Sequence, residues 1–344
     1  MGTSSELRPK RATSASSPSE HTGMLAGADA PSVRPSTSRG QLPAALAALR
    51  PRQWTKNGLL FLALIFAHRL LDLGAVERVA LAFVAFALAS SAVYILNDWV
   101  DRDRDRLHPV KRLRPLASGA LSPGVALVTA LASLLAATGL TIWLGVWLAW
   151  QPDPFAMWGG SPALFAATLG GYVALNVAYS FYLKQQPLWD VFIIAIGFVL
   201  RAMAGALAIP APISPWFYLC ATFLALFLAL SKRRAELATF SAAAASQRQN
   251  LGVYTLQLLD QLVAIMATSA LISYSFYTFQ GGGAGHALML TIPFALFGVF
   301  RYLFLMYTQG AGERPDELLW RDRQLFLCVA LWGVVTLALL YGAP

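Results

Sequence analysis

Hydrophobic residues along this 344-residue chain fall in long runs, and polar residues fall in short clusters between them. A helix that crosses the hydrocarbon core of a membrane needs roughly 20 mostly apolar residues. By that rule the pattern predicts about nine spans, at residues 58–74, 78–98, 122–150, 162–183, 188–209, 214–231, 256–279, 286–309 and 324–342. The predicted fold class is therefore all-α, a polytopic bundle of transmembrane helices.

Composition supports this reading. The chain is 57% hydrophobic and only 12% charged, whereas soluble domains are roughly 25% charged. Residues 1–40 are rich in Ser, Thr, Pro, Ala and Gly without apolar periodicity, which predicts a disordered cytoplasmic tail. Residues 41–344 then form one transmembrane domain. Cys220 and Cys328 both lie inside apolar runs, which is typical of free, buried thiols.

The basic residues are distributed unevenly between the two sides of the predicted bundle. With the N-terminus in the cytoplasm, 22 of the 26 Lys and Arg residues lie in the tail and in loops on that side. This is the asymmetry of the positive-inside rule. We therefore expect a multi-pass protein of the cell (inner) membrane with cytoplasmic polar loops. The net charge of +9 reflects this topology and does not indicate a nucleic-acid partner.

The richest polar segment, NDWVDRDRDRLHPVKRLRPLASG (97–119), directly follows the second predicted span. Asp98, Asp101 and Asp105 have i, i+3, i+7 spacing, which predicts three carboxylates on one helical face. Such a face needs a positive partner, and Mg²⁺ prefers oxygen ligands and substrate phosphates. The alternative is a solvated loop of alternating charges, and that reading is preferred for Asp103, which points off this face.

Three cations follow the carboxylates closely. Lys111, Arg112 and Arg114 suit contacts with phosphate oxygens. Carboxylates for a metal beside cations for phosphate predict a site that binds a magnesium–diphosphate. His108 lies in the same segment but far from the other histidines, so we interpret it as a loop residue.

The pattern NDxxDxxxD followed by HPxKRxRPxASG resembles the first aspartate-rich motif of the UbiA superfamily of intramembrane prenyltransferases. The resemblance extends from about Leu49 to the C-terminus and implies a helical bundle whose central cavity is capped by cytoplasmic loops. Typical members carry a second aspartate-rich motif. Here the corresponding loop reads SKRRAEL (231–237), which is basic and has Glu236 as its only acid.

Further motifs narrow the resemblance. LRPRQWTKN (49–57), the Tyr-Ser-x-x-Leu-Lys pattern (179–184), KRRAEL (232–237) and PDELLWRDRQL (315–325) are together similar to one subgroup. Its members transfer 5-phosphoribose from phosphoribosyl pyrophosphate to decaprenyl phosphate, a polyprenyl phosphate, and release pyrophosphate. The product supplies arabinan precursors of the cell wall. The resemblance implies Mg²⁺ as cofactor and is compatible with a homo-oligomer.

The residue patterns and the motif matches together give a set of expected site residues. Catalytic roles fall to Asp98, Asp101 and Lys184, and metal binding to Asp98, Asp101 and Asp105. The expected substrate-binding residues are Lys56, Asn57, Asn97, Lys111, Arg112, Arg114, Tyr179, Lys184, Lys232, Arg233 and Arg234. Lys56 and Lys184 also fit anchors at the membrane boundary. Of the run 232–234, one residue is expected to face solvent or headgroups.

Two arginines lie within apolar spans, and each is a functional hypothesis by default because a charge there is costly. They are Arg201 and Arg301. For Arg201 the alternative to a functional role is a structural one, an ion pair with Asp190. Asp322 and Glu317 either orient the basic loops or belong to a solvated amphipathic stretch.

Two other functions remain open from the residues. A UbiA-type enzyme that uses a prenyl diphosphate and an aromatic acceptor would need a second acidic motif. A transporter would place its ionisable site near mid-membrane, whereas these acids lie at a boundary beside phosphate-type cations.

Overall fold

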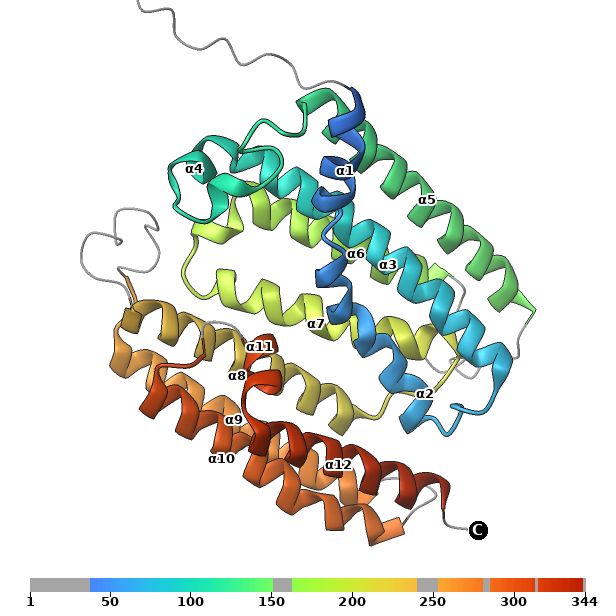
Figure 1. The fold of residues 1–344 in the computed structure, drawn as a ribbon. Coiled ribbons are helices and arrows are strands. Elements are labelled where there is room, and N and C mark those ends of the chain that lie inside the picture. Colours follow the sequence, from blue (N-terminus) through green and yellow to red (C-terminus); the bar gives the residue numbers. More distant parts are fainter. Residues whose placement is uncertain (1–37, 151–162, 240–252, 281–284, 313–314, 343–344) are drawn as a thin grey trace, which may run out of the picture. The chain divides into compact units, whose positions relative to one another are not determined.

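The computed structural model describes residues 38–150, 163–239, 253–280, 285–312 and 315–342, and all regular structure in these ranges is helical (Figure 1). The all-α prediction is thus confirmed. Most of the predicted tail, residues 1–37, lies outside the described residues, and a helix begins at Ser38. The predicted division into a tail and one transmembrane domain stays a prediction.

The described α-helices are α1 (Ser38–Ala48), α2 (Leu62–Phe66), α3 (Leu73–Val100), α4 (Arg102–Leu107), α5 (Pro123–Ala149), α6 (Ala163–Phe181), α7 (Trp189–Ala208), α8 (Pro215–Thr239), α9 (Leu256–Gln280), α10 (Ile292–Gln309), α11 (Pro315–Arg321) and α12 (Arg323–Tyr341). Four 3₁₀ segments join them: η1 (Pro51–Phe61), η2 (Lys111–Leu113), η4 (Leu183–Gln185) and η7 (Gly285–Thr291).

Eight of the predicted spans are present as helical stretches long and apolar enough to cross a membrane, among the residues that the structure describes. The first predicted span, 58–74, has a different form. It is built from η1 and α2, which run into each other from Pro51 to Phe66. Because a 3₁₀-helix rises about 2.0 Å per residue and an α-helix about 1.5 Å, this composite reaches about 30 Å, the thickness of the hydrocarbon core.

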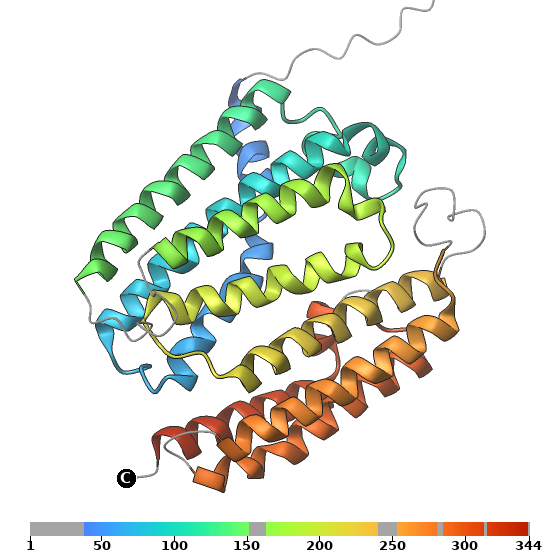
Figure 2. The same ribbon diagram turned by 180° about the vertical axis from the view of Figure 1, so that it is seen from behind.

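The helices form two packed halves that meet along α7 and α8. In the first half, α3 packs against α5, α6 and η1, and α7 packs against α6 and η1. In the second half, α8 packs along α9, and α10 packs against α12. Figures 1 and 2 show the halves from opposite sides, with α1, η1 and α2 running across α3 and α7. Each half has its own buried apolar cluster.

A glycine allows the composite segment to lie directly against α7. A Cβ atom on Gly205 would be 2.1 Å from the carbonyl oxygen of Leu60. No side chain fits at that distance, so α7 and η1 are in backbone contact at this point.

Large apolar side chains cover the outward face of the bundle. Val128, Leu135 and Ile142, at seven-residue intervals on α5, are 66%, 72% and 62% exposed. A soluble protein rarely exposes a continuous apolar stripe of this size, whereas lipid tails cover it without cost. The protein is therefore a multi-pass membrane protein.

Candidate active site

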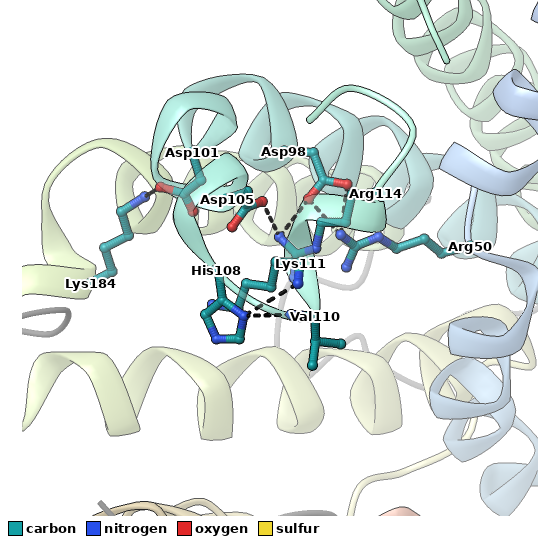
Figure 3. A network of polar contacts seen from close by, with 9 residues as sticks. All are labelled: Arg50, Asp98, Asp101, Asp105, His108, Val110, Lys111, Arg114 and Lys184. Carbon is teal, nitrogen blue, oxygen red and sulfur yellow. Dashed lines mark hydrogen bonds and ion pairs between the residues drawn. The ribbon is translucent and has the colours of Figure 1, made fainter. Parts of the chain in front are cut away.

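Three carboxylates and three basic side chains lie together at the end of α3 and form a network of two groups of ion pairs (Figure 3). Its members are Asp98, Asp101, Asp105, Arg50, Arg114 and Lys184. Arg50 Nη2 donates to the two carboxylate oxygens of Asp98 at 2.5 and 2.7 Å. Arg114 Nη1 donates to Asp98 at 3.0 Å and to Asp105 at 2.7 Å. Lys184 Nζ donates to Asp101 at 2.6 Å. Asp98 and Asp105 are buried, and such charges are stable only when paired.

The three carboxylates do not lie on one continuous helix. Helix α3 ends at Val100, and α4 begins only at Arg102, so Asp101 lies at a break between them. Three carboxylates stacked on one face would repel one another. The break relieves this repulsion, because Asp98 and Asp105 turn toward the same arginine while Asp101 faces Lys184.

Arg50 was not among the expected site residues, although it lies inside the LRPRQWTKN motif. It occupies the left-handed region with φ 54° just before Pro51. The surrounding segment is fixed on α3, because Trp54 Nε1 donates to Ser91 Oγ at 3.0 Å and Ser91 Oγ donates to the Leu49 carbonyl at 2.8 Å. The position of Arg50 in this motif, beside the first apolar run, is the feature of the sequence that could have identified it as a site residue.

The loop that carries Lys184 is held by the start of α7. Leu188 has a positive φ of 66°, and its N–H donates to the Tyr254 hydroxyl oxygen at 2.6 Å. The Tyr254 hydroxyl in turn donates to Asp190 at 2.9 Å, and Arg233 Nε donates to the same carboxylate at 2.8 Å. Burial raises the pKa of Tyr254 to about 12, so the hydroxyl remains a donor. These bonds fix the position of the lysine loop relative to α8.

The loop after α4 is held by hydrogen bonds to His108. His108 Nδ1 accepts from the backbone N–H groups of Val110 and Lys111 at 3.2 and 3.3 Å, which agrees with its interpretation as a loop residue. Asp103 is 80% exposed and pairs with Arg102 and Arg106. The interpretation of Asp103 as surface charge is therefore confirmed.

The basic run 232–234 is paired with acids on α7, α8 and α9. Arg233 is buried and donates to Glu236 at 2.6 Å, in addition to its bond with Asp190. Arg234 Nε donates to Asp260 at 2.9 Å. Lys232 Nζ is 4.0 Å from Glu236, and its side chain is 45% exposed, the most of the three. Contact between this run and a substrate stays a prediction, with Lys232 the most accessible candidate.

Arg201 does not pair with Asp190, so that alternative is wrong. The two residues are on the same helix, and 11 residues of α-helix separate them by about 16 Å. Instead Arg201 Nε donates to Asn57 Oδ1 at 2.8 Å, and Nη2 donates to the Tyr172 hydroxyl oxygen at 2.7 Å. The expected substrate-binding residue Asn57 is thus brought into contact with a buried arginine.

Arg301 has a structural partner. Its Nε and Nη2 donate to the two carboxylate oxygens of Asp322 at 3.1 and 2.7 Å, and Asp322 also accepts from the N–H of Leu325 at the start of α12. This pair joins α10 to α12. Glu317 pairs with the exposed Arg321, as expected for a solvated stretch.

For the remaining expected residues, contact with a substrate stays a prediction. Lys56, Asn97, Lys111 and Tyr179 are half-buried, and Arg112 is exposed. Cys220 and Cys328 are free thiols, as predicted.

The expected magnesium ligands do not form a preassembled cage. In the part of the chain that the structure describes, no group of three Asp, Glu, His or Cys side chains is arranged to hold a metal ion. Mg²⁺ is often held by only one or two carboxylates together with substrate phosphates. Asp98 and Asp105, which are joined through Arg114, fit that smaller requirement.

A helical membrane bundle with a charge-paired carboxylate network at one end defines an intramembrane protein whose polar site suits anionic substrates. Residues 58–311 match the model of the UbiA prenyltransferase family. The protein belongs to this family, and the resemblance expected from the first aspartate-rich motif is confirmed.

Curated relatives extend the match. The chain is 34% identical to the decaprenyl-phosphate phosphoribosyltransferase of Corynebacterium glutamicum over 305 residues, which cover 86% of each protein. It is 34% identical to the protein of the same name from Mycolicibacterium smegmatis over 314 residues, 86% of this chain and 92% of the relative. Identity to that of Mycobacterium tuberculosis is 33% over 307 residues, 86% of this chain and 94% of the relative.

Solved structures share the fold. A UbiA homologue from Archaeoglobus fulgidus bound to GPP and Mg²⁺ superposes with a TM-score of 0.62 at 19% identity, over 86% of this chain and 99% of that one. A digeranylgeranylglyceryl phosphate synthase superposes with a TM-score of 0.63 at 13% identity, over 88% and 99% of the two chains.

Proposed function

We propose that this protein transfers 5-phosphoribose from phosphoribosyl pyrophosphate to decaprenyl phosphate or a similar polyprenyl phosphate, and releases pyrophosphate. The observation that carries the proposal is the network of Asp98, Asp101 and Asp105 with Arg50, Arg114 and Lys184. It combines oxygen ligands for a metal with cations for phosphate oxygens. The names of the relatives in Corynebacterium and Mycolicibacterium support the choice of substrates.

The reaction is a displacement at C1 of the ribose. A phosphate oxygen of the lipid forms the new bond to C1, and the bond from C1 to the pyrophosphate oxygen breaks with its electron pair going to pyrophosphate. The transition state has oxocarbenium character, as in other glycosyl transfers. The attacking oxygen is already anionic at neutral pH, so no proton needs to be removed. Catalysis then depends on positioning and electrostatics.

The carboxylates and cations have separate tasks in this reaction. Asp98 and Asp101, with Asp105, would hold Mg²⁺ beside the diphosphate of the donor. When bound, the ion supplies Lewis-acid neutralisation of the leaving group. Arg50, Arg114 and Lys184 would exchange their carboxylate partners for phosphate oxygens as the donor binds. Arginine is suited to this exchange because it binds phosphate and carboxylate with the same geometry.

The basic loop of the second half fits a lipid acceptor that carries only one phosphate. A conventional family member binds a prenyl diphosphate, whereas here the diphosphate would be on the soluble donor. One magnesium–carboxylate site then suffices. The accessible Lys232 on α8 is a candidate for headgroup contact.

The proposal includes the cell (inner) membrane as location, with the N-terminus and the site facing the cytoplasm, where a soluble phosphoribosyl donor is present. The positive-inside asymmetry supports this orientation. Assembly into a homo-oligomer stays a prediction, which the mass of the detergent-solubilised protein would test.

The test is transfer of label from radioactive phosphoribosyl pyrophosphate to added decaprenyl phosphate by purified protein, with and without Mg²⁺. We expect a labelled lipid that forms only with Mg²⁺. The matched variants Asp98→Asn and Asp103→Asn each remove one negative charge. Asp98 is buried in the network and Asp103 is exposed outside it, so comparison of the two shows whether transfer depends on the network or on surface charge. Absence of labelled lipid with the wild-type protein, while a prenyl diphosphate is consumed, would overturn the proposal.

A further inference from the structure

Arg201 is a buried cation whose hydrogen bonds with the described residues are all to neutral groups. Its side chain is 5% exposed, and it donates to Asn57 Oδ1, to the Gly197 carbonyl at 3.0 Å and to the Tyr172 hydroxyl oxygen. The guanidinium also lies 4.7 Å from the centre of the Tyr172 ring and 5.4 Å from that of Phe198. Among the described residues, no carboxylate forms an ion pair with it. A charge within a membrane span is costly without an opposite charge.

Asn57 adds hydrogen-bond donors beside this charge. Its side chain is 1% exposed, and Nδ2 has no partner in the described structure. The orientation of the amide is fixed, because a guanidinium only donates and therefore requires Oδ1 on its side. The amide NH₂ is left as a buried donor without an acceptor, which costs about as much as a lost hydrogen bond.

The position of this pair is deeper than the carboxylate network. The Tyr172 hydroxyl that binds Arg201 also lies 3.2 Å from Ser90 Oγ on α3. Ser90 precedes Asp98 by eight residues on the same helix, which is about 12 Å along its axis. The pair therefore lies inside the bundle, below the carboxylates and within the first half.

We propose that Arg201 and Asn57 form a second anion site that binds a phosphate monoester. Two features support it: Arg201 has no opposite charge among the described residues, and the Asn57 amide has no acceptor for its NH₂ group. A phosphate offers oxygens to both groups at once. The inference rests on the proposed function, which brings two phosphate monoesters to this protein, the headgroup of the polyprenyl phosphate and the 5-phosphate of the donor.

Both groups are enclosed in this structure, so the phosphate must reach them through movement of the segment that carries Asn57. That segment is η1, a 3₁₀-helix of 11 residues. Runs of 3₁₀-helix longer than three or four residues are uncommon, since their hydrogen bonds have poorer geometry, and such stretches often act as hinges. Displacement of η1 from α7 would therefore expose both groups, although the contact of Leu60 with Gly205 must open for this to happen.

A single substitution separates this role from a structural one. In Asn57→Asp, a carboxylate of nearly the same shape as the amide faces Arg201. The contact between η1 and α7 is kept, and the hydrogen bond becomes an ion pair. If the pair only holds the helices together, this variant should bind ligands as the wild type does. If it is a phosphate site, the new carboxylate neutralises Arg201, removes the NH₂ donors and repels the ligand.

The experiment measures binding of decaprenyl phosphate, of neutral decaprenol and of phosphoribosyl pyrophosphate to purified wild-type, Asn57→Asp and Arg201→Gln proteins, with melting temperature recorded for each. Arg301→Gln is the matched control, because Arg301 also lies in an apolar helix but is paired with Asp322. We expect Asn57→Asp to melt no lower than the wild type and to lose about tenfold or more in affinity for one phosphate compound. The affinity of this variant for decaprenol should not change, and Arg301→Gln should bind all three compounds as the wild type does.

Each outcome decides a question. A loss confined to decaprenyl phosphate assigns the site to the lipid headgroup, and a loss confined to phosphoribosyl pyrophosphate assigns it to the donor. Wild-type affinity of Asn57→Asp for both compounds overturns the second anion site and leaves the proposed function intact. A wild-type protein that binds neither compound overturns the proposed function, and the site assignment with it.

Discussion

Arg50 Nη2 lies 2.5 and 2.7 Å from the two carboxylate oxygens of Asp98, although the residues are 48 positions apart in the sequence. Arg50 belongs to the turn between α1 and η1, and Asp98 to the last turn of α3. The contact therefore joins the N-terminal segment to the centre of the carboxylate network. Since Asp98 is also bound by Arg114, removal of Arg50 leaves the carboxylate with one remaining cation.

Two substitutions of Arg50 distinguish its side chain from its backbone. Arg50→Ala and Arg50→Gly both remove the bond to Asp98, and we expect both to lower transfer activity equally. Only alanine keeps a Cβ at φ 54°, which costs about 1–2 kcal/mol. The glycine variant should therefore unfold at a higher denaturant concentration than the alanine variant. Equal stability of the two variants would show that the left-handed turn is not strained.

Exchange of the partners Asp101 and Lys184 tests whether their ion pair is more than structural. The atoms Lys184 Nζ and Asp101 Oδ1 are 2.6 Å apart. Lys184→Ala should weaken binding of the anionic donor, seen as a raised KM for phosphoribosyl pyrophosphate. In the exchanged protein, Asp101→Lys with Lys184→Asp, we expect the melting temperature to recover because the pair is restored with reversed charges. Transfer should not recover, since the carboxylate would then be on the loop after α6 and the cation at the end of α3.

The matching thermodynamic cycle compares the wild type, the single variants Asp101→Lys and Lys184→Asp, and the exchanged protein. A coupling of about 0.5–3 kcal/mol is typical of residues in contact. Activity close to wild type in the exchanged protein would contradict the roles proposed for both residues.

The backbone contact at Gly205 gives a prediction about stability. In Gly205→Ala the new Cβ would be 2.1 Å from the Leu60 carbonyl oxygen, so η1 and α7 must separate. Overpacking of this kind costs about 1–3 kcal/mol or more, and we expect a lower melting temperature in detergent and reduced transfer. Gly171→Ala is the control. A Cβ there meets nothing within 4 Å, and alanine in a helix stabilises by about 0.5–1 kcal/mol. Equal melting temperatures of the two variants would refute the contact.

The sequence predicted the parts of the fold that depend on local pattern. Eight of the spans could be found because a membrane helix is a continuous apolar run, and Asp103 could be recognised as surface charge because its partners, Arg102 and Arg106, are local. The segment 58–74 could be recognised as apolar but not as a 3₁₀-helix followed by a short α-helix. This segment lies in backbone contact with Gly205 at Leu60, a tertiary contact that local pattern does not show.

The pairing of charges was the part that local pattern could not predict. The spacing of Asp98, Asp101 and Asp105 predicts one face of a continuous helix, whereas the helix is interrupted at Asp101 and Asp101 has a different cation as partner from Asp98 and Asp105. Arg201 was matched with the nearest acid in its own helix, Asp190, whereas the fold brings Asn57 to it from a distant segment. In both cases the partner is set by packing between helices.

The contact between Arg301 and Asp322 predicts a pH dependence of stability. The hydrogen bonds from Arg301 hold the pKa of Asp322 below its usual range. A carboxyl group with a lowered pKa in the folded state contributes stability above its unfolded pKa of about 3.9, and this contribution is lost as the pH falls through the lower folded value. Asp322→Asn removes the charge but keeps an oxygen that can cap α12. We expect the variant to melt below the wild type at pH 7 and the two melting temperatures to converge as the pH falls below about 4. A difference that stays constant from pH 7 to pH 3 would mean that Asp322 stabilises α12 through its cap rather than through Arg301.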